Sequence, residues 1–76
     1  MANARKILLV DDDAELRDAL VEQLALHQEF ETNAVESAQA ALEEAKSGHV
    51  DLVLMDVGLP DMDGRDAVRV LRKNGF

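Results

Sequence analysis

The sequence predicts an α/β fold of the βαβαβα type, a three-layer arrangement with one parallel sheet between helices. Two short runs, at residues 6–10 and 52–55, are apolar throughout except for Lys6, and each leads directly into aspartates. Such runs, ended by turn residues, are typical of strands buried in a parallel sheet. The stretches between them repeat apolar residues at helical spacing. Crossovers of this kind are right-handed, so we expect the strands to be parallel. We expect the first strand at the centre, beside a topological switch point.

Each expected element has recognisable end signals. Asp13, Ser37 and Asp63 are residue types that cap the helices that follow them. Their side chains can accept hydrogen bonds from the first-turn backbone amides, which have no partner within the helix. Gly48 and Gly75 are typical of helix ends. The expected elements are a strand at 6–10, a helix at 14–27, a strand at 30–35, a helix at 37–47, a strand at 51–56 and a helix at 64–73.

The apolar residues predict which faces are buried. Leu16, Leu20 and Leu24 form a stripe on the first helix. An alanine-rich stripe on the second helix implies close approach to the sheet. Residues 30–35 alternate between apolar and polar, which predicts an edge strand with one wet face. The unbroken apolar run 52–55 instead predicts a strand buried on both faces.

The composition restricts the classes of function. A chain of 76 residues makes one small domain at most. It has no cysteine, which excludes disulfides and zinc–thiolate sites, and no apolar run near the ~18 residues of a membrane helix. Acids outnumber bases by 16 to 8, and a net charge of −8 argues against contact between this domain and nucleic acid. We therefore expect a cytoplasmic domain that binds neither nucleic acid nor membrane.

Aspartates gather at one edge of the predicted sheet. Asp11, Asp12 and Asp13 follow the first strand, and Asp56 follows the third. The carboxyl ends of neighbouring parallel strands meet at one edge, where open α/β sheets bind ligands. Two charges about 4 Å apart repel by roughly 4 kcal/mol at an effective dielectric of about 20. Several such carboxylates favour a cation, and Mg²⁺ fits an all-oxygen site with few protein ligands.

Together these residues resemble the receiver domain of two-component response regulators. The matching motifs are residues 9–13 after the first strand, Asp56 after the third, and residues 59–64 ahead of the third helix. The spacing from Asp56 to Gly64 is that of the family. The resemblance covers the whole chain, which corresponds to the first three βα units of the family's domain. It implies a truncated flavodoxin-like receiver fold with the strand order 2-1-3.

The resemblance also implies roles for the site residues. Asp56 is then the phospho-accepting nucleophile, modified by a sensor histidine kinase or a phosphotransfer protein with Mg²⁺. Asp12 should bind the metal directly and Asp11 through water. The Asp56 carboxylate and the backbone carbonyl of Gly58 complete the implied ligands. Asp61, in the loop after Asp56, is expected to be solvated.

Two residues that the family uses have no counterpart here. These are a hydroxyl residue after the fourth strand and a lysine after the fifth. Lys6, Lys46 and Lys73 are expected on the surface, away from the acids. The resemblance therefore implies that phosphorylation of this 76-residue chain is impaired.

Two other classes of function have to be weighed. Phosphatases of the haloacid-dehalogenase type also use an aspartate nucleophile with Mg²⁺, but they need a second acid two residues later, where this chain has Gly58. We therefore do not expect an enzyme. A non-catalytic dimerisation or interaction module is the alternative function.

The third strand predicts self-association. In the family this strand has neighbours on both sides, whereas here only the first strand is available to pair with it. The free edge at 52–55 carries no lysine, proline or bulge to block a second chain. The third helix should also be partly uncovered around Val68 and Leu71. A two-fold homodimer through the third strand is the simplest closure.

Overall fold

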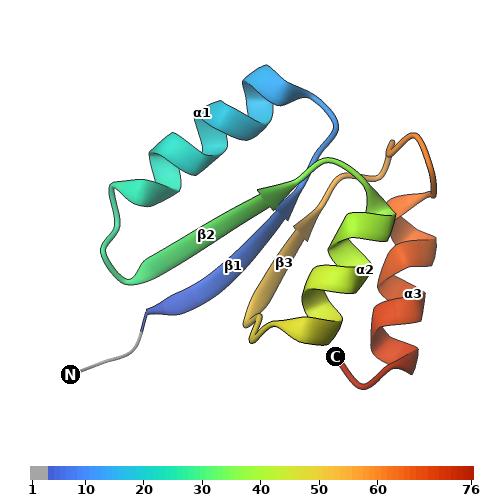
Figure 1. Ribbon diagram of the computed structural model, residues 1–76. Coiled ribbons are helices and arrows are strands. Elements are labelled where there is room, and N and C mark those ends of the chain that lie inside the picture. Colours follow the sequence, from blue (N-terminus) through green and yellow to red (C-terminus); the bar gives the residue numbers. More distant parts are fainter. Residues whose placement is uncertain (1–3) are drawn as a thin grey trace.

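Three parallel strands form the sheet, and β1 lies at its centre (Figure 1). The computed structural model describes residues 4–76. β1 spans Arg5–Val10, one residue longer than predicted because its first residue pairs with β2. β2 spans Phe30–Val35 and β3 spans Leu52–Met55, and each runs parallel to β1. The predicted α/β fold with the strand order 2-1-3 is therefore confirmed.

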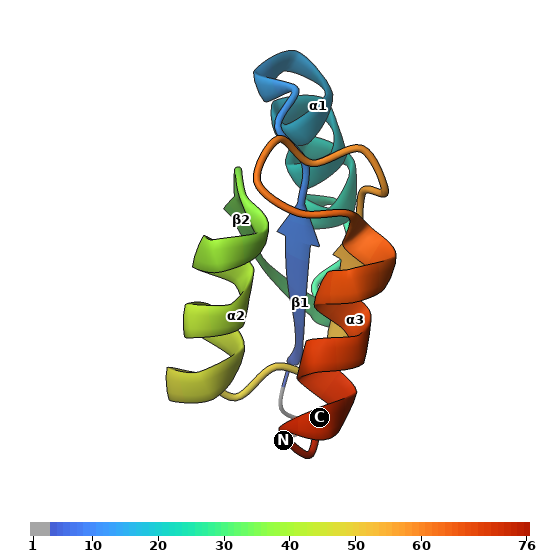
Figure 2. The ribbon, with the colours of Figure 1, turned by 90° about the vertical axis from the view of Figure 1, so that its right-hand side faces the viewer.

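Helices cover both faces of the sheet. α1 (Ala14–Ala25) lies on one face, and α2 (Ala38–Ser47) and α3 (Gly64–Lys73) lie side by side on the other (Figure 1, Figure 2). Leu71 of α3, expected to be partly uncovered, is buried because α3 packs against α2.

Within residues 4–76, no helix combines the length and the apolar character that crossing a bilayer requires.

The main core lies between the sheet and the α2–α3 layer. Leu8 and Val10 of β1 are the largest fully buried side chains. They belong to one cluster with Ala38 and Ala41 of α2 and Ala67 of α3. Small side chains let the helices approach the sheet closely, as the alanine-rich stripe predicts. Each buried Leu or Val contributes ~1.5–3 kcal/mol to stability.

The opposite face is less completely covered. Ile7 and Leu9 are buried there, but Leu52 and Leu54 of β3 are 49% and 39% exposed. α1 packs over β2 and β1, and its Leu16 is 47% exposed. The prediction that the third strand is buried on both faces is therefore wrong, because α1 lies over the other two strands.

The three predicted N-caps are confirmed. The side chains of Asp13, Ser37 and Asp63 accept hydrogen bonds from backbone amides in the first turns of α1, α2 and α3, at 3.2, 3.2 and 2.8 Å. Ser37 itself has an extended backbone, with φ −144° and ψ 159°. α2 therefore begins at Ala38, one residue later than the predicted start.

Two other element ends differ from the prediction. α1 ends at Ala25 and not at residue 27, because the amides of Leu26 and His27 bond to carbonyls three residues back and tighten the last turn. β3 is shorter than 51–56. The amide of Asp56 still bonds to β1, but its side chain accepts the amide of Gly58 and the chain turns out of the sheet.

Candidate functional site

Three aspartates converge at the carboxyl edge of the sheet. Asp11 and Asp12 follow β1, and Asp56 follows β3. These strands are neighbours, and Val10 is the register partner of Met55, so the residues that follow leave the sheet side by side. One carboxylate oxygen of each aspartate lies within 4.8 Å of those of the other two. The structure thus brings together the three carboxylates that the sequence singles out.

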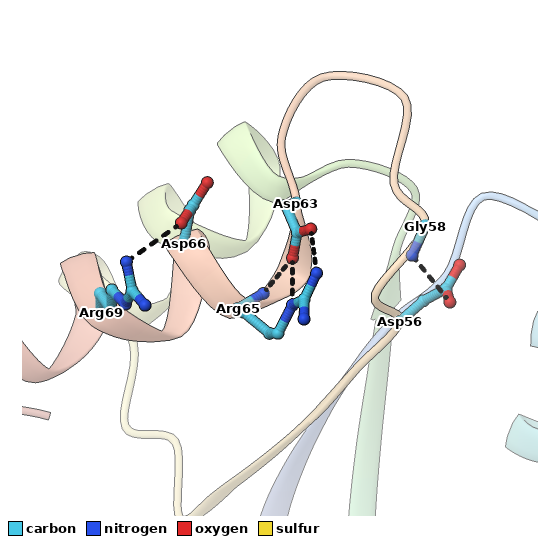
Figure 3. Close-up of polar contacts among 6 residues, drawn as sticks. All are labelled: Asp56, Gly58, Asp63, Arg65, Asp66 and Arg69. Carbon is cyan, nitrogen blue, oxygen red and sulfur yellow. Dashed lines mark hydrogen bonds and ion pairs between the residues drawn. The ribbon is translucent and has the colours of Figure 1, made fainter.

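Hydrogen bonds from backbone amides hold two of these carboxylates, those of Asp11 and Asp56, in place. Asp11 is buried, and its Oδ1 accepts the amide of Asp13 at 2.9 Å. Asp12 is exposed. Asp56 is half-buried, and its Oδ1 accepts the amide of Gly58 at 3.2 Å (Figure 3). Gly58, the fourth predicted ligand, is thereby held beside the Asp56 carboxylate.

The oxygens gathered here suit a hard divalent cation. Mg²⁺ prefers oxygen ligands, takes one or two carboxylates from a protein and keeps several waters. The exposed Asp12 leaves the site open to such waters. Two carboxylates ~5 Å apart repel by roughly 3 kcal/mol at an effective dielectric of about 20. A bound cation would remove that repulsion, so the residues present fit one.

Arg17 contacts the site, and the lysines lie elsewhere. Helical periodicity puts Arg17 on the polar side of α1, but its Nη1 reaches back and donates to the backbone carbonyl of Asp11 at 2.9 Å. It therefore fixes the backbone of Asp11. Lys6 lies at the amino end of β1, and Lys46 and Lys73 lie in the last turns of α2 and α3. All three lysines are exposed, as expected.

The loop at 57–63 joins Asp56 to α3 and is anchored at both ends. The amide of Gly64 donates to the carbonyl of Val57 at 3.0 Å and closes the loop. The side chain of Leu59 is buried in the main core. Gly64 approaches the end of β3 so closely that a Cβ there would overlap the carbonyl oxygen of Asp56. A glycine at this position lets α3 start directly beside the site.

Asp61 connects the same loop to α2. Its Oδ1 accepts the amide of Ala38 and its Oδ2 accepts the amide of Gln39, each at 3.0 Å. The hydrogen bonds from Gln39 and Ala38 lower the pKa of the Asp61 carboxyl below its usual value. Asp61 is exposed to solvent, as expected, but it also accepts these two amides of α2, a contact that was not predicted from the sequence. Its partners lie 23 and 22 residues away in the sequence, so no local pattern predicts them.

Asp63 forms a separate polar cluster at the start of α3. It accepts the amide of Arg65 at 2.8 Å, and the Arg65 side chain donates to it at 3.1 and 3.0 Å (Figure 3). These hydrogen bonds and the charge of Arg65 lower the pKa of Asp63 to about 2. Further along α3, exposed Arg69 and Asp66 pair at 3.6 Å. The Asp63–Arg65 and Asp66–Arg69 contacts both lie at α3 and do not include the three grouped aspartates.

Comparison with known proteins decides the family. Residues 7–75 match the family model of the response regulator receiver domain. The chain belongs to this family. The resemblance carried by the aspartate motifs is thus confirmed. The two-component response regulator PhoP of Pseudomonas aeruginosa is 41% identical to this receiver domain over 70 residues, which make up 92% of the chain and 31% of PhoP.

Solved receiver domains share the fold. The CheY-like receiver domain protein of Methanospirillum hungatei superposes with a TM-score of 0.91 at 27% identity, over 96% of this chain and 58% of that one. The response regulator TrrA of Thermotoga maritima, in complex with Mg²⁺-BeF, gives 0.88 at 32% identity, over 93% and 61%. TrrA in complex with the histidine kinase ThkA gives 0.85 at 33% identity, over 91% and 59%. This receiver domain therefore spans less than two thirds of each matched chain.

Proposed function

We propose that this receiver domain accepts a phosphoryl group on Asp56 from a sensor histidine kinase or a phosphotransfer protein, with Mg²⁺ as cofactor. The convergence of Asp11, Asp12 and Asp56 within 4.8 Å is the observation that carries the proposal. These three carboxylates and the backbone carbonyl of Gly58 are the proposed ligands. Support also comes from TrrA, whose structures contain Mg²⁺-BeF in one case and the kinase ThkA in another.

In the proposed transfer, a carboxylate oxygen of Asp56 attacks the phosphorus of a phosphohistidine. The phosphorus–nitrogen bond breaks, an acyl phosphate forms, and the imidazole leaves with the electron pair and takes up a proton. When bound, the cation supplies charge neutralisation at the phosphoryl oxygens. Asp11 and Asp12 would hold it, and the amide of Gly58 orients the Asp56 carboxylate. Such transfers depend mostly on positioning and on charge neutralisation.

The same residues favour a signalling module over an enzyme. A phosphatase of the haloacid-dehalogenase type needs an acid two residues after its nucleophile, and Gly58 has no side chain. The family uses a lysine at this site. Lys6 lies at the amino end of β1, and Lys46 and Lys73 lie at the far ends of α2 and α3, so none of the three can take that role and we expect the transfer to be slow. We place the domain in the cytoplasm. Its net charge of −8 opposes direct contact with nucleic acid.

Treatment with acetyl phosphate and Mg²⁺ tests the proposal. The wild type should gain the mass of one phosphoryl group on the peptide that contains Asp56, and chelation of Mg²⁺ should prevent the gain. Asp56→Asn lacks the nucleophilic carboxylate and should gain nothing. Asp18→Asn, at an exposed acid on α1, removes the same charge elsewhere and should behave as the wild type does. Equal modification of Asp56→Asn and the wild type would remove Asp56 from this role.

A second proposed function is homodimerisation through β3. In the described part of the chain, β3 is an edge strand of the sheet. Its Leu52 and Leu54 are exposed, and the strand contains neither lysine nor proline. Such an edge is a template for pairing with another chain. Two copies joined edge to edge about a two-fold axis would form one continuous sheet, which supports a role as an interaction module.

A further inference from the structure

The side chain of Asp61 joins two segments that are far apart in the sequence. Its two oxygens accept the amides of Ala38 and Gln39, each at 3.0 Å. These amides open α2 and have no partner within the helix. The next amide, that of Ala40, is bonded to the hydroxyl of Ser37 at 3.2 Å. α2 therefore has a local cap, Ser37, and a second cap that comes from the loop after Asp56.

The second cap acts on the loop as well as on the helix. The loop at 57–63 begins directly after Asp56, and its Gly58 amide holds the Asp56 carboxylate at 3.2 Å. The loop is closed by the bond from the Gly64 amide to the Val57 carbonyl at 3.0 Å. In the sequence, Asp61 lies between Gly58 and Gly64. Breaking the Asp61 bonds would remove the polar link between the loop and α2 and leave the loop held there by its apolar contacts, such as those of buried Leu59. The position of Gly58 beside Asp56 would then be less well defined.

We propose that Asp61 is a positioning residue for the phosphoryl site: by tethering the 57–63 loop to the N-terminus of α2, it holds Gly58 beside Asp56. This inference rests on the proposed function of that site. A carboxylate suits the role, because it can accept two amides at once and because negative charge is favoured at a helix N-terminus. Asp61 is not a member of the cluster of three aspartates and acts on it through the loop.

The simpler explanation is that Asp61 only caps α2, and Ser37 provides the matched control. Ser37→Ala removes a cap from α2 without touching the loop. Asp61→Ala removes a cap from the same helix and also releases the loop. Asp61→Asn keeps one carbonyl oxygen, so it should retain part of the tether.

Two NMR measurements on the full chain separate these explanations. Both alanine variants should speed hydrogen exchange in the first turn of α2, but only Asp61→Ala should speed exchange of the Gly64 amide. In a Mg²⁺ titration followed on the amides of residues 56–58, Asp61→Ala should weaken binding ~10-fold, the lower end of the losses seen when a group that orients metal ligands is removed. Asp61→Asn should weaken it less, and Ser37→Ala should leave it unchanged.

The proposal fails if Asp61→Ala leaves exchange of the Gly64 amide unchanged. It also fails if Ser37→Ala and Asp61→Ala change that exchange and the Mg²⁺ affinity equally, since the effect would then be one of helix capping alone. Absence of Mg²⁺ binding by the wild type would instead contradict the proposed function. In that case, exchange of the Gly64 amide still decides whether Asp61 tethers the loop.

Discussion

Individual aspartates in this chain act in different ways according to the groups that surround them. Asp13 and Asp63 cap the helices that they precede, and their amide partners lie three and two residues along the chain. Such local bonds can be predicted from the sequence. Asp61 makes the same kind of bond across 22 and 23 residues, and Arg17 bonds back across the β1–α1 turn to Asp11. No local pattern carries those contacts, because the tertiary fold creates them.

Gly64→Ala should destabilise the domain by about 1–3 kcal/mol, the usual range for forcing extra atoms into a packed site. A Cβ at Gly64 would overlap the carbonyl oxygen of Asp56, so α3 would have to move away from the site. Gly58→Ala is the matched control, because a Cβ there meets no atom within 4 Å. Urea denaturation of both variants measures the difference. Equal stability of the two would show that the close approach at Gly64 is unimportant.

The stabilising charge of Asp63 should be lost at acid pH. Its pKa is lowered from 3.8 to about 2 by the bonds and charge of Arg65. A lowered carboxyl pKa contributes stability above the unfolded-state value, and this contribution disappears as pH falls through the folded-state value. Asp63→Asn keeps a capping oxygen but loses the charge, so it should be less stable than the wild type near neutral pH.

Denaturation at a series of pH values tests this prediction. The difference between the wild type and Asp63→Asn should shrink between pH 3.8 and about 2, the two pKa values of the carboxyl. A difference that is the same at neutral pH and at about pH 2 would mean that the charge of Asp63 does not stabilise the fold.

At the scale of helices and strands, the starts of helices could be predicted better than their ends or than the burial of strand faces. The starts of α1 and α3 follow from the capping aspartates before them, which the sequence displays. The end of α1 depends on which carbonyls the backbone amides of Leu26 and His27 bond to, and no side chain in the sequence indicates those partners. Burial of β3 depends on which helices lie over it. An apolar run alone does not carry that information.

The exposed edge and face of β3 should cause self-association. Sedimentation over a concentration series should show the chain shifting from monomer to dimer, because Leu52 and Leu54 form an exposed apolar strip on β3, an edge strand among residues 4–76. Leu54→Lys should weaken the association by placing a charge on that strip. Leu26→Lys, at a 74% exposed leucine at the end of α1, is the control and should not. A well-folded wild-type monomer at high concentration would contradict the prediction.

At the scale of the whole molecule, topology assembles the candidate site. Asp11 and Asp56 are far apart in the sequence, and the parallel pairing of β1 with β3 brings them to one edge. This convergence could be predicted because right-handed crossovers make the strands parallel and the family resemblance places the first strand at the centre. The anchoring of the 57–63 loop on α2 could not, since it depends on where α2 packs in the tertiary structure.

A Mg²⁺ titration followed by backbone amide shifts tests the central claim most directly. Mg²⁺ should shift the amides around Asp11, Asp12 and Asp56 as one saturable set, because their carboxylates lie within 4.8 Å of one another. Asp12→Ala should abolish or strongly weaken this binding, whereas Asp18→Ala, which removes an equal charge from the exposed side of α1, should leave it intact. Shifts scattered over the acidic surface, or binding unchanged by Asp12→Ala, would contradict a Mg²⁺ site at the edge of the sheet.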